Sequence, residues 1–236
     1  MDRAVTKGMS VKAGILIPAY NESEHIGDLI RRLRGMNFEP IVIDDGSSDN
    51  TAETARKSGA KVMRHEKNMG KGAALKTGFA AILNENYDAA IIMDGDAQHS
   101  PGDVAKLIAV AEKNPNALVI GNRMGNAPNM PIARKLTNKS MSFLVSSICR
   151  QRIPDSQCGF RLIRKALLRK ITIESSRFEV ESEILVKASA AGVDIISVPV
   201  ETLYGKEASQ INPFWDTCRF VYFLFRIAFR SKARQN

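Results

Sequence analysis

Short apolar runs alternate with amphipathic segments along the first 120 residues of the chain. Five of the runs are typical of β-strands, and they lie at 13–18, 40–45, 60–65, 87–94 and 116–121. Helical patterns lie between them, at 22–35, 50–58, 71–85 and 101–113. Because strands that alternate with helices form βαβ units, we expect an α/β fold with a mainly parallel sheet flanked by helices.

The pattern changes after residue 121. Residues 122–131 are rich in Asn, Gly and Pro, which predicts a loop. Three helical patterns and one strand pattern follow, at 132–150, 164–171, 178–191 and 193–200 respectively. No stretch resembles an interdomain linker. We therefore expect an N-terminal tail at 1–12, a single domain at 13–212 and a C-terminal appendage at 213–236.

The C-terminal appendage has an apolar helical pattern, PFWDTCRFVYFLFRIAFR at 213–230, which arginines interrupt. Arg219, Arg226 and Arg230 fall within roughly 40° of one another on a helix, and aromatic and aliphatic side chains occupy the remaining face. This amphipathic pattern predicts a helix that lies in a membrane interface. The alternative is a helix packed onto the domain or onto a second subunit. The sequence contains no apolar stretch of about 18 residues, so we expect no membrane-spanning helix.

Composition and charge narrow the function classes. The start of the chain lacks the apolar core of a secretory signal, and three scattered cysteines offer neither a disulfide framework nor a zinc site. We therefore expect a cytoplasmic protein. The net charge is +9, and the segment from Arg123 to Lys170 holds eleven Lys or Arg and one acid, Asp155. This bias indicates an anionic partner: nucleic acid, anionic lipid or a phosphorylated ligand.

Polar residues follow three of the predicted strands directly, as Asn21-Glu22, Asp44-Asp45 and Asp94-Asp96. Ligands of parallel sheets bind at the carboxyl ends of the strands, so these residues predict a polar site on one edge of the sheet. In the run IIMDGDAQH, Asp94 and Asp96 point to the same side if the strand extends to its end. Two close carboxylates predict a Mg²⁺ or Mn²⁺ site, and ordinary turn chemistry is the alternative.

Two common nucleotide-binding motifs do not occur in the chain. The first predicted strand leads into IPAYNES instead of G-x-G-x-x-G. The segment NMGKGAA at 68–74 lacks the first glycine and the Ser or Thr of a P-loop. It predicts a tight turn from a strand into a helix, although its glycine amides could also bind phosphate at the helix N-terminus.

Six short motifs occur in a specific order. They are IPAYNE (17–22), DDGSSDNT (44–51), NMGKGAALKTG (68–78), DGDAQH (94–99), GNR (121–123) and DSQCGFR (155–161). With this ordered set, the chain resembles the inverting family 2 glycosyltransferases over residues 13–212. It is most similar to the branch of dolichyl-phosphate mannosyltransferases and bacterial polyprenyl-phosphate sugar transferases. The resemblance implies a GT-A fold, in which a Rossmann-like nucleotide half is joined to an acceptor half.

The resemblance also implies roles for individual residues. Those expected to hold the nucleoside are Pro18, Tyr20, Glu22, Ile43 and Asp45. Those expected to meet the sugar diphosphate are Asp94, Gly95, Asp96 and Arg123. The two aspartates would bear the Mg²⁺ or Mn²⁺, helped by Gln98. Arg123 and Arg161 would also face the acceptor phosphate.

The identity of the acceptor decides whether a general base is needed. A hydroxyl acceptor must lose a proton, and Asp155 and Glu181 are the candidate bases. A lipid phosphate is already anionic, and the basic region from Arg123 to Lys170 fits it better. In the expected acceptor loop at 201–213, Thr202 and Ala208 stand where related mannosyltransferases carry Arg and Lys, and Lys206 is the candidate replacement. The donor is therefore open between GDP-mannose and a UDP-hexose.

We thus expect a metal-dependent glycosyltransferase that transfers a hexose to a polyprenyl or dolichyl phosphate with inversion. It would be peripheral on the cytoplasmic face of the membrane, alone, as a homo-oligomer or with a separate membrane partner. One alternative is a family 2 enzyme with a hydroxyl acceptor in cell-wall, polysaccharide or glycolipid synthesis. A second alternative, a basic nucleic-acid-binding protein, is disfavoured because acids cluster at the strand ends and no stacking-aromatic motif occurs.

Overall fold

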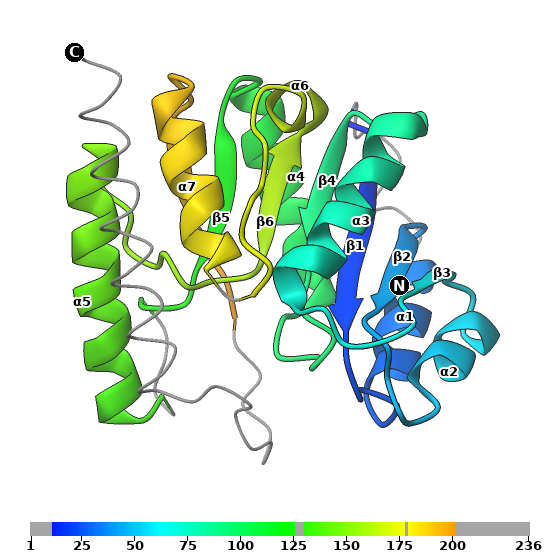
Figure 1. The fold of residues 1–236 in the computed structure, drawn as a ribbon. Helices are drawn as coiled ribbons and strands as arrows, with labels where there is room; N and C mark the ends of the chain where they lie inside the picture. The colour runs from blue at the N-terminus through cyan, green and yellow to red at the C-terminus, as the bar shows by residue number, and fades with distance from the viewer. Residues whose placement is uncertain (1–10, 126–129, 178, 202–236) are drawn as a thin grey trace.

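The computed structural model describes residues 11–125, 130–177 and 179–201, which form an α/β domain (Figure 1). The strands are β1 (Ala13–Ala19), β2 (Glu39–Asp44), β3 (Lys61–Arg64), β4 (Ala89–Ile92), β5 (Leu118–Asn122), β6 (Arg161–Arg164) and β7 (Ile195–Pro199). The helices are α1 (Ile26–Gly35), α2 (Thr51–Lys57), α3 (Lys71–Asn84), the short 3₁₀ turn η1 (Pro101–Asp103), α4 (Val104–Lys113), α5 (Ile132–Cys149), α6 (Lys165–Leu168) and α7 (Val180–Ala190). The elements alternate as the sequence predicts.

The strands described here form one mainly parallel sheet in the order β3-β2-β1-β4-β6-β5-β7. Strands β3, β2, β1 and β4 are parallel, as are β5 and β7. Strand β6 is antiparallel to both of its neighbours, β4 and β5. The sequence pattern did not predict β6, because its four residues lie between a motif loop and a helical pattern, and only pairing with β4 and β5 makes them extended.

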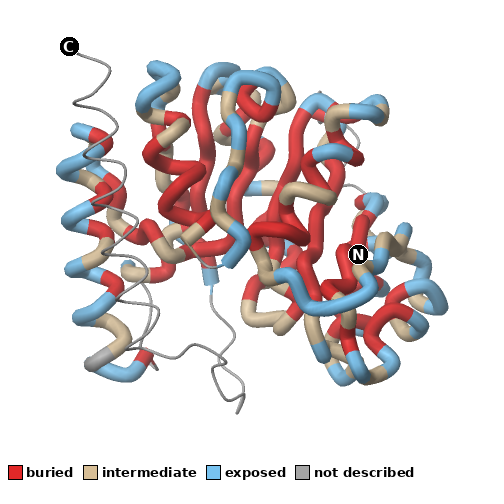
Figure 2. The backbone as a smooth tube through the Cα atoms, in the orientation of Figure 1, coloured by how far each residue is buried: buried red, intermediate tan, exposed pale blue. Residues whose placement is uncertain are grey.

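Helices cover both faces of the sheet, and the core lies in two layers between them. On one face Leu16 packs in a cluster with Leu75 of α3 and Ile184 of α7. On the other face Ile15 and Ile17 pack in a cluster with residues of α1 and α4. Figure 2 shows the buried strands running through the middle of the molecule. A sheet buried on both faces explains why its strands read as continuous apolar runs in the sequence.

Two sequence predictions concern a membrane: the absence of a spanning helix and the amphipathic helix at 213–230. Within the described residues, no helix combines the length and the apolar character needed to cross a bilayer. The amphipathic helix expected at 213–230 lies outside the described residues, and so does Lys206.

Candidate active site

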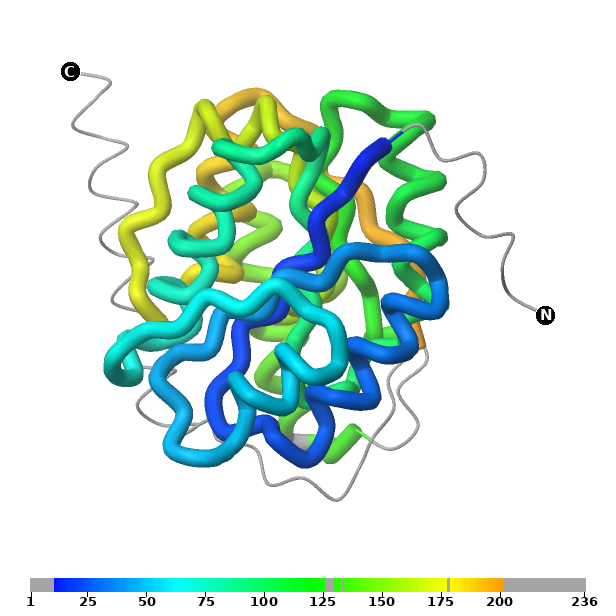
Figure 3. Tube along the Cα trace, turned by 90° about the vertical axis from the view of Figure 1, so that its right-hand side faces the viewer, coloured from blue at the N-terminus to red at the C-terminus, as the bar shows by residue number. Residues whose placement is uncertain are grey.

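The polar residues that follow β1, β2 and β4 lie on one edge of the sheet. These three strands are adjacent and parallel, so their carboxyl ends point the same way. The N-terminal segments that form this side of the molecule are blue to cyan in Figure 3. The expectation of a polar site at this edge therefore agrees with the sheet topology.

Asp94, Gly95 and Asp96 form a turn beyond the end of β4. The strand ends at Ile92, and Ala97 has a φ of 55°, in the left-handed region. The expectation that an extended strand aligns the two carboxylates is therefore wrong, because the strand ends before Asp94. A turn brings them near each other instead. The space for the Asp94 carboxylate depends on Gly159, where an added Cβ would lie 2.5 Å from Asp94 Oδ2.

Sequence reasoning missed Lys71, the residue that binds Asp94 most directly. Its Nζ lies 2.6 Å from Asp94 Oδ1 and 2.6 Å from Glu181 Oε1. The ion pair thus joins the start of α3, the turn after β4 and the start of α7. The only sequence signal was a lysine between two glycines at the beginning of a helical pattern.

The charges of this cluster shift the pKa values of its members. Burial disfavours charge on Asp94, yet the Lys71 ammonium and the imidazole of His99 hold its pKa well below the ordinary value. Burial also opposes charge on Lys71, but Asp94 and Glu181 raise its pKa above the ordinary value. Burial and the neighbouring Asp94 charge raise the pKa of Asp96. Two carboxylates that repel each other in this way favour a cation between them.

His99 lies beside Asp94 and was not expected to be part of the site. Its Nε2 is 3.7 Å from Asp94 Oδ2, and its ring stacks on Phe160 with 5.2 Å between the ring centroids. His99 Nδ1 is buried and has no hydrogen-bond partner among the described residues. Stacking and burial hold the imidazole against the turn at residues 94–96, which we call the acid turn.

Arg123 and Asp155, both predicted site residues, form a buried ion pair. Arg123 donates from Nε at 2.8 Å and from Nη2 at 2.9 Å to the two carboxylate oxygens, and its backbone N–H donates to Oδ2. Burial would raise the pKa of Asp155, but these bonds and the Arg123 charge lower it. Both oxygens of Asp155 are occupied, which does not suit a general base.

Arg161 does not lie where it could meet a phosphate. Its side chain is fully buried, and Nε, Nη1 and Nη2 donate to backbone carbonyls of Cys158, Glu181 and Ser156 respectively. The expected phosphate contact is corrected to a structural role. Arg161 fastens the 156–158 turn to the start of α7 and so positions Glu181.

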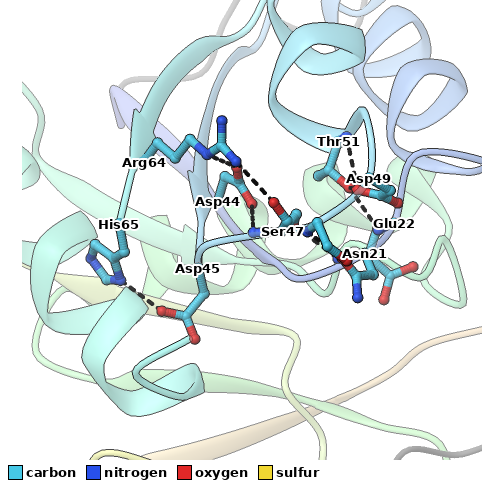
Figure 4. A network of polar contacts seen from close by, with 10 residues as sticks. Asn21, Glu22, Asp44, Asp45, Ser47, Asp49, Thr51, Arg64 and His65 are labelled. Carbon is cyan, nitrogen blue, oxygen red and sulfur yellow. Dashed lines mark hydrogen bonds and ion pairs between the residues drawn. The ribbon is translucent and has the colours of Figure 1, made fainter. Parts of the chain in front are cut away.

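The turns after β1 and β2 form a polar network around the expected nucleoside residues (Figure 4). The Glu22 backbone N–H donates to Thr51 at 2.8 Å. Both oxygens of Asp45 accept hydrogen bonds from the backbone N–H groups of Met69 and Gly70. The imidazole of His65 also contacts Asp45, with Nδ1 2.6 Å from Oδ1. Asp45 therefore ties the turn after β2 to the turn before α3.

The other expected nucleoside residues differ in exposure. Tyr20 is partly exposed beyond β1, and Pro18 is buried within the strand. Ile43 is fully buried in the core beneath α3. Its side chain therefore does not reach the site, and its expected contact with a nucleoside is corrected to core packing.

The acid turn fits a hard divalent cation that keeps most of its ligands from outside the protein. Across the part of the chain that the structure describes, no group of three or more His, Cys, Asp or Glu is arranged to hold a metal ion. Asp94 and Asp96 are two carboxylates, and Mg²⁺ is commonly bound by one or two carboxylates plus substrate phosphates and water. Gln98 contacts Asp96 through its backbone N–H at 3.0 Å.

Comparison with known proteins assigns the chain to a family. The sequence profile described as Glycosyl transferase family 2 matches residues 14–172. The chain belongs to glycosyl transferase family 2. The family resemblance drawn from the six motifs is thereby confirmed, and the protein is a glycosyltransferase.

Curated relatives of this glycosyltransferase include two proteins that are named for transfer to dolichyl or dolichol phosphate. The UDP-N-acetylglucosamine–dolichyl-phosphate N-acetylglucosaminyltransferase of Methanococcus voltae is 32% identical over 213 residues, covering 80% of this chain and 85% of that protein. The dolichol-phosphate mannosyltransferase of Pyrococcus furiosus is 34% identical over 203 residues, covering 80% of this chain and 56% of that protein.

Solved structures share the fold at low sequence identity. Mannosyl-3-phosphoglycerate synthase from Rubrobacter xylanophilus has a TM-score of 0.70 and 16% identity, covering 98% of this chain and 77% of that one. Glucosyl-3-phosphoglycerate synthase from Mycobacterium tuberculosis, in complex with Mn²⁺, UDP and phosphoglyceric acid, has a TM-score of 0.69 and 19% identity. The match covers 94% of this chain and 78% of that one. The expected GT-A fold is confirmed.

Proposed function

We propose that this glycosyltransferase moves a hexose from a nucleotide sugar to a polyprenyl or dolichyl phosphate, with inversion and with Mg²⁺ or Mn²⁺. The observation that carries the proposal is the position of two acids, Asp94 and Asp96, just after β4 at the carboxyl edge of the sheet in a chain of glycosyl transferase family 2. Two relatives named for transfer to dolichyl or dolichol phosphate support the acceptor, and a fold neighbour crystallised with Mn²⁺ and UDP supports the metal and the donor class.

The chain's own residues suggest how the donor would be held. Asp94 and Asp96 would hold the metal, which as a Lewis acid neutralises the charge that gathers on the leaving diphosphate. The turns around Tyr20, Glu22 and Asp45 would hold the nucleoside beside them. The acceptor would attack from the side opposite the leaving diphosphate, and a single displacement of this kind inverts the anomeric carbon.

The state of the candidate bases favours a phosphate acceptor over a hydroxyl acceptor. Asp155 is bound by Arg123 through both oxygens. Glu181 is paired with the Lys71 ammonium group through Oε1, and only its buried Oε2 is without a partner among the described residues. A hydroxyl acceptor would need one of them as a free proton acceptor. A phosphate oxygen is already anionic and needs attraction and positioning, which suits the basic residues between Arg123 and Lys170 other than the buried Arg123 and Arg161.

Helix α5 supports contact with a membrane that carries the acceptor lipid. Of its large apolar side chains, the three most exposed are Ile132 at 86%, Phe143 at 72% and Leu136 at 66%. They fall within about 40° of one another around the helix, at 100° per residue. Lys139 lies on the same side and is exposed. An apolar stripe with an adjacent cation suits an interface with anionic lipid, so we infer a peripheral position on the cytoplasmic face.

The experiment is a transfer assay with radiolabelled UDP-hexoses and GDP-mannose, polyprenyl phosphate and Mn²⁺. We expect label to enter organic-extractable lipid with one donor. The Asp96→Ala variant should lose turnover by about a hundredfold or more and keep its melting temperature, because a metal ligand is removed from a surface turn. Asp194→Ala, at an exposed position outside the site, is the matched control.

Two results would contradict the proposal. Label that enters only water-soluble products would favour the hydroxyl-acceptor enzyme. Full activity of the Asp96→Ala variant, with or without a chelator, would remove the metal assignment.

A further inference from the structure

Lys71 lies at the N-terminus of a helix, where a positive charge is unfavourable. It is the first residue of α3, and the partial positive charge of a helix N-terminus repels an ammonium group. The two carboxylates at 2.6 Å, from Asp94 and Glu181, offset that repulsion. The largely buried Lys71 thus depends on acids that come from two other segments of the chain.

The backbone around Lys71 fixes its position. An added Cβ at Gly72 would lie 2.5 Å from the Ser175 carbonyl oxygen, so the start of α3 is packed directly against the segment that precedes α7. The Glu183 carboxylate holds that segment from α7, accepting from the backbone N–H groups of Glu174 and Ser175 at 2.8 Å each. Lys71 has little freedom to move as a whole, so a change in its ion pairs requires movement of the side chain.

A divalent cation on the acid turn would compete with Lys71 for Asp94. The ammonium group occupies Asp94 Oδ1, and Gly159 closely borders Oδ2. Two cations on the same carboxylate repel each other strongly at such short range. Glu181 Oε2 is buried without a hydrogen-bond partner among the described residues, so Glu181 has acceptor capacity left for an ammonium group that gives up Asp94.

We propose that Lys71 is a positioning residue that serves as an internal counter-cation, holding Asp94 until the metal and the nucleoside diphosphate arrive together. This inference rests on the proposed function, because it needs a metal at Asp94 and Asp96. The ammonium group then leaves Asp94 and stays with Glu181, near the incoming diphosphate. Metal alone binds weakly because it must displace Lys71. Metal with diphosphate binds tightly because the diphosphate charge compensates for the displaced ammonium group.

The test is calorimetric titration of Mn²⁺ into the full chain, without nucleotide and with saturating UDP or GDP. In Lys71→Met, Mn²⁺ alone should bind about tenfold tighter or more than in wild type, because a competing positive charge a few ångströms away is gone. The gain in Mn²⁺ affinity from the nucleotide should shrink by a similar factor. Lys71→Arg keeps the charge and should resemble wild type. Lys57→Met, which removes a lysine from an exposed ion pair on α2, is the matched control.

Several outcomes would overturn the inference. One is a Lys71→Met variant that melts like wild type and binds Mn²⁺ alone no tighter. A crystal structure of the wild type with Mn²⁺ and UDP or GDP tests the inference without any variant. We expect Lys71 Nζ to lie beyond roughly 4 Å from Asp94 Oδ1, outside ion-pair range. A Lys71 that still bridges both acids beside a bound metal contradicts the proposal. Absence of Mn²⁺ binding in every variant, with and without nucleotide, would remove the proposed metal function as well.

Discussion

At the scale of single residues, the buried pair of Arg123 and Asp155 joins two parts of the site. Arg123 follows β5, and Asp155 belongs to the segment that leads into β6. Two charges taken out of water are costly unless geometry is good and the remaining polar atoms are bonded. Here the contact is bidentate and is supported by the Arg123 backbone N–H. The pair therefore positions the loop around Gly159, against which Asp94 lies.

We expect Asp155→Asn to destabilise the fold by about 3–5 kcal/mol, because it leaves Arg123 buried without its counter-charge. Urea unfolding at pH 7 measures the change, and Asp194→Asn at an exposed position is the control. The lowered pKa of Asp155 means that its contribution is present above the unfolded pKa and is lost as pH falls through the folded pKa. The stability difference between wild type and Asp155→Asn should therefore shrink below about pH 4. A difference that stays constant down to pH 2 would contradict this account.

At the scale of elements, α5 has two apolar sides with different partners. Val145 and Cys149 face the core, and α5 packs against α7. Ile132, Leu136 and Phe143 are exposed. A soluble surface helix normally presents polar residues on its outer face, so a contiguous exposed apolar stripe indicates a surface used for binding.

Changing this stripe should weaken membrane binding without unfolding the domain. We expect the double variant Leu136→Ser and Phe143→Ser to bind vesicles containing anionic lipid roughly tenfold or more weakly, because each apolar side chain gains about 1.5–3 kcal/mol on full burial. Co-sedimentation measures the binding. Ile148→Ser lies about 160° around the same helix from Ile132 and is the control. Equal sedimentation of wild type and the double variant would assign the stripe to another partner.

At the scale of the whole molecule, the antiparallel strand β6 assembles the site. It lies between β4 and β5 and so brings the segment 155–161 across the sheet. That segment contributes Asp155, Gly159 and Arg161 beside the turn after β4. The site is thus formed by the parallel strand ends on one side and by the antiparallel insertion on the other.

Binding of a donor nucleotide should stabilise the whole domain, because these segments meet around it. We expect the nucleotide of the true donor, UDP or GDP, to raise the melting temperature by roughly 5–10 °C when Mn²⁺ is present and the nucleotide concentration is about a hundredfold above the Kd of that nucleotide. Thermal shift measurements with each nucleotide compare the two bases, and omission of Mn²⁺ with a chelator present is the control. No shift with either nucleotide would contradict the assignment of this edge to the donor.

The sequence by itself determined the α/β class, the alternating elements and the family. Apolar runs with both faces buried are visible in the sequence because the burial requirement applies to consecutive residues. The common location of the acids after β1, β2 and β4 could also be predicted from the sequence. Parallel strands place their carboxyl ends on one edge, so the expected parallel orientation was enough to bring Glu22, Asp45 and Asp94 to the same side.

The tertiary structure alone decided how the charges pair. Lys71 and Glu181 are 110 positions apart and meet only because α3 and α7 begin at the same edge. The family resemblance implied ligand contacts for Arg161 and Ile43, but both are buried, since β6 and β2 place them inside the domain. Motif spacing specifies which residues are present along the chain. It does not specify which carboxylate a lysine or arginine contacts, because ion pairs depend on distances between segments that are remote in sequence.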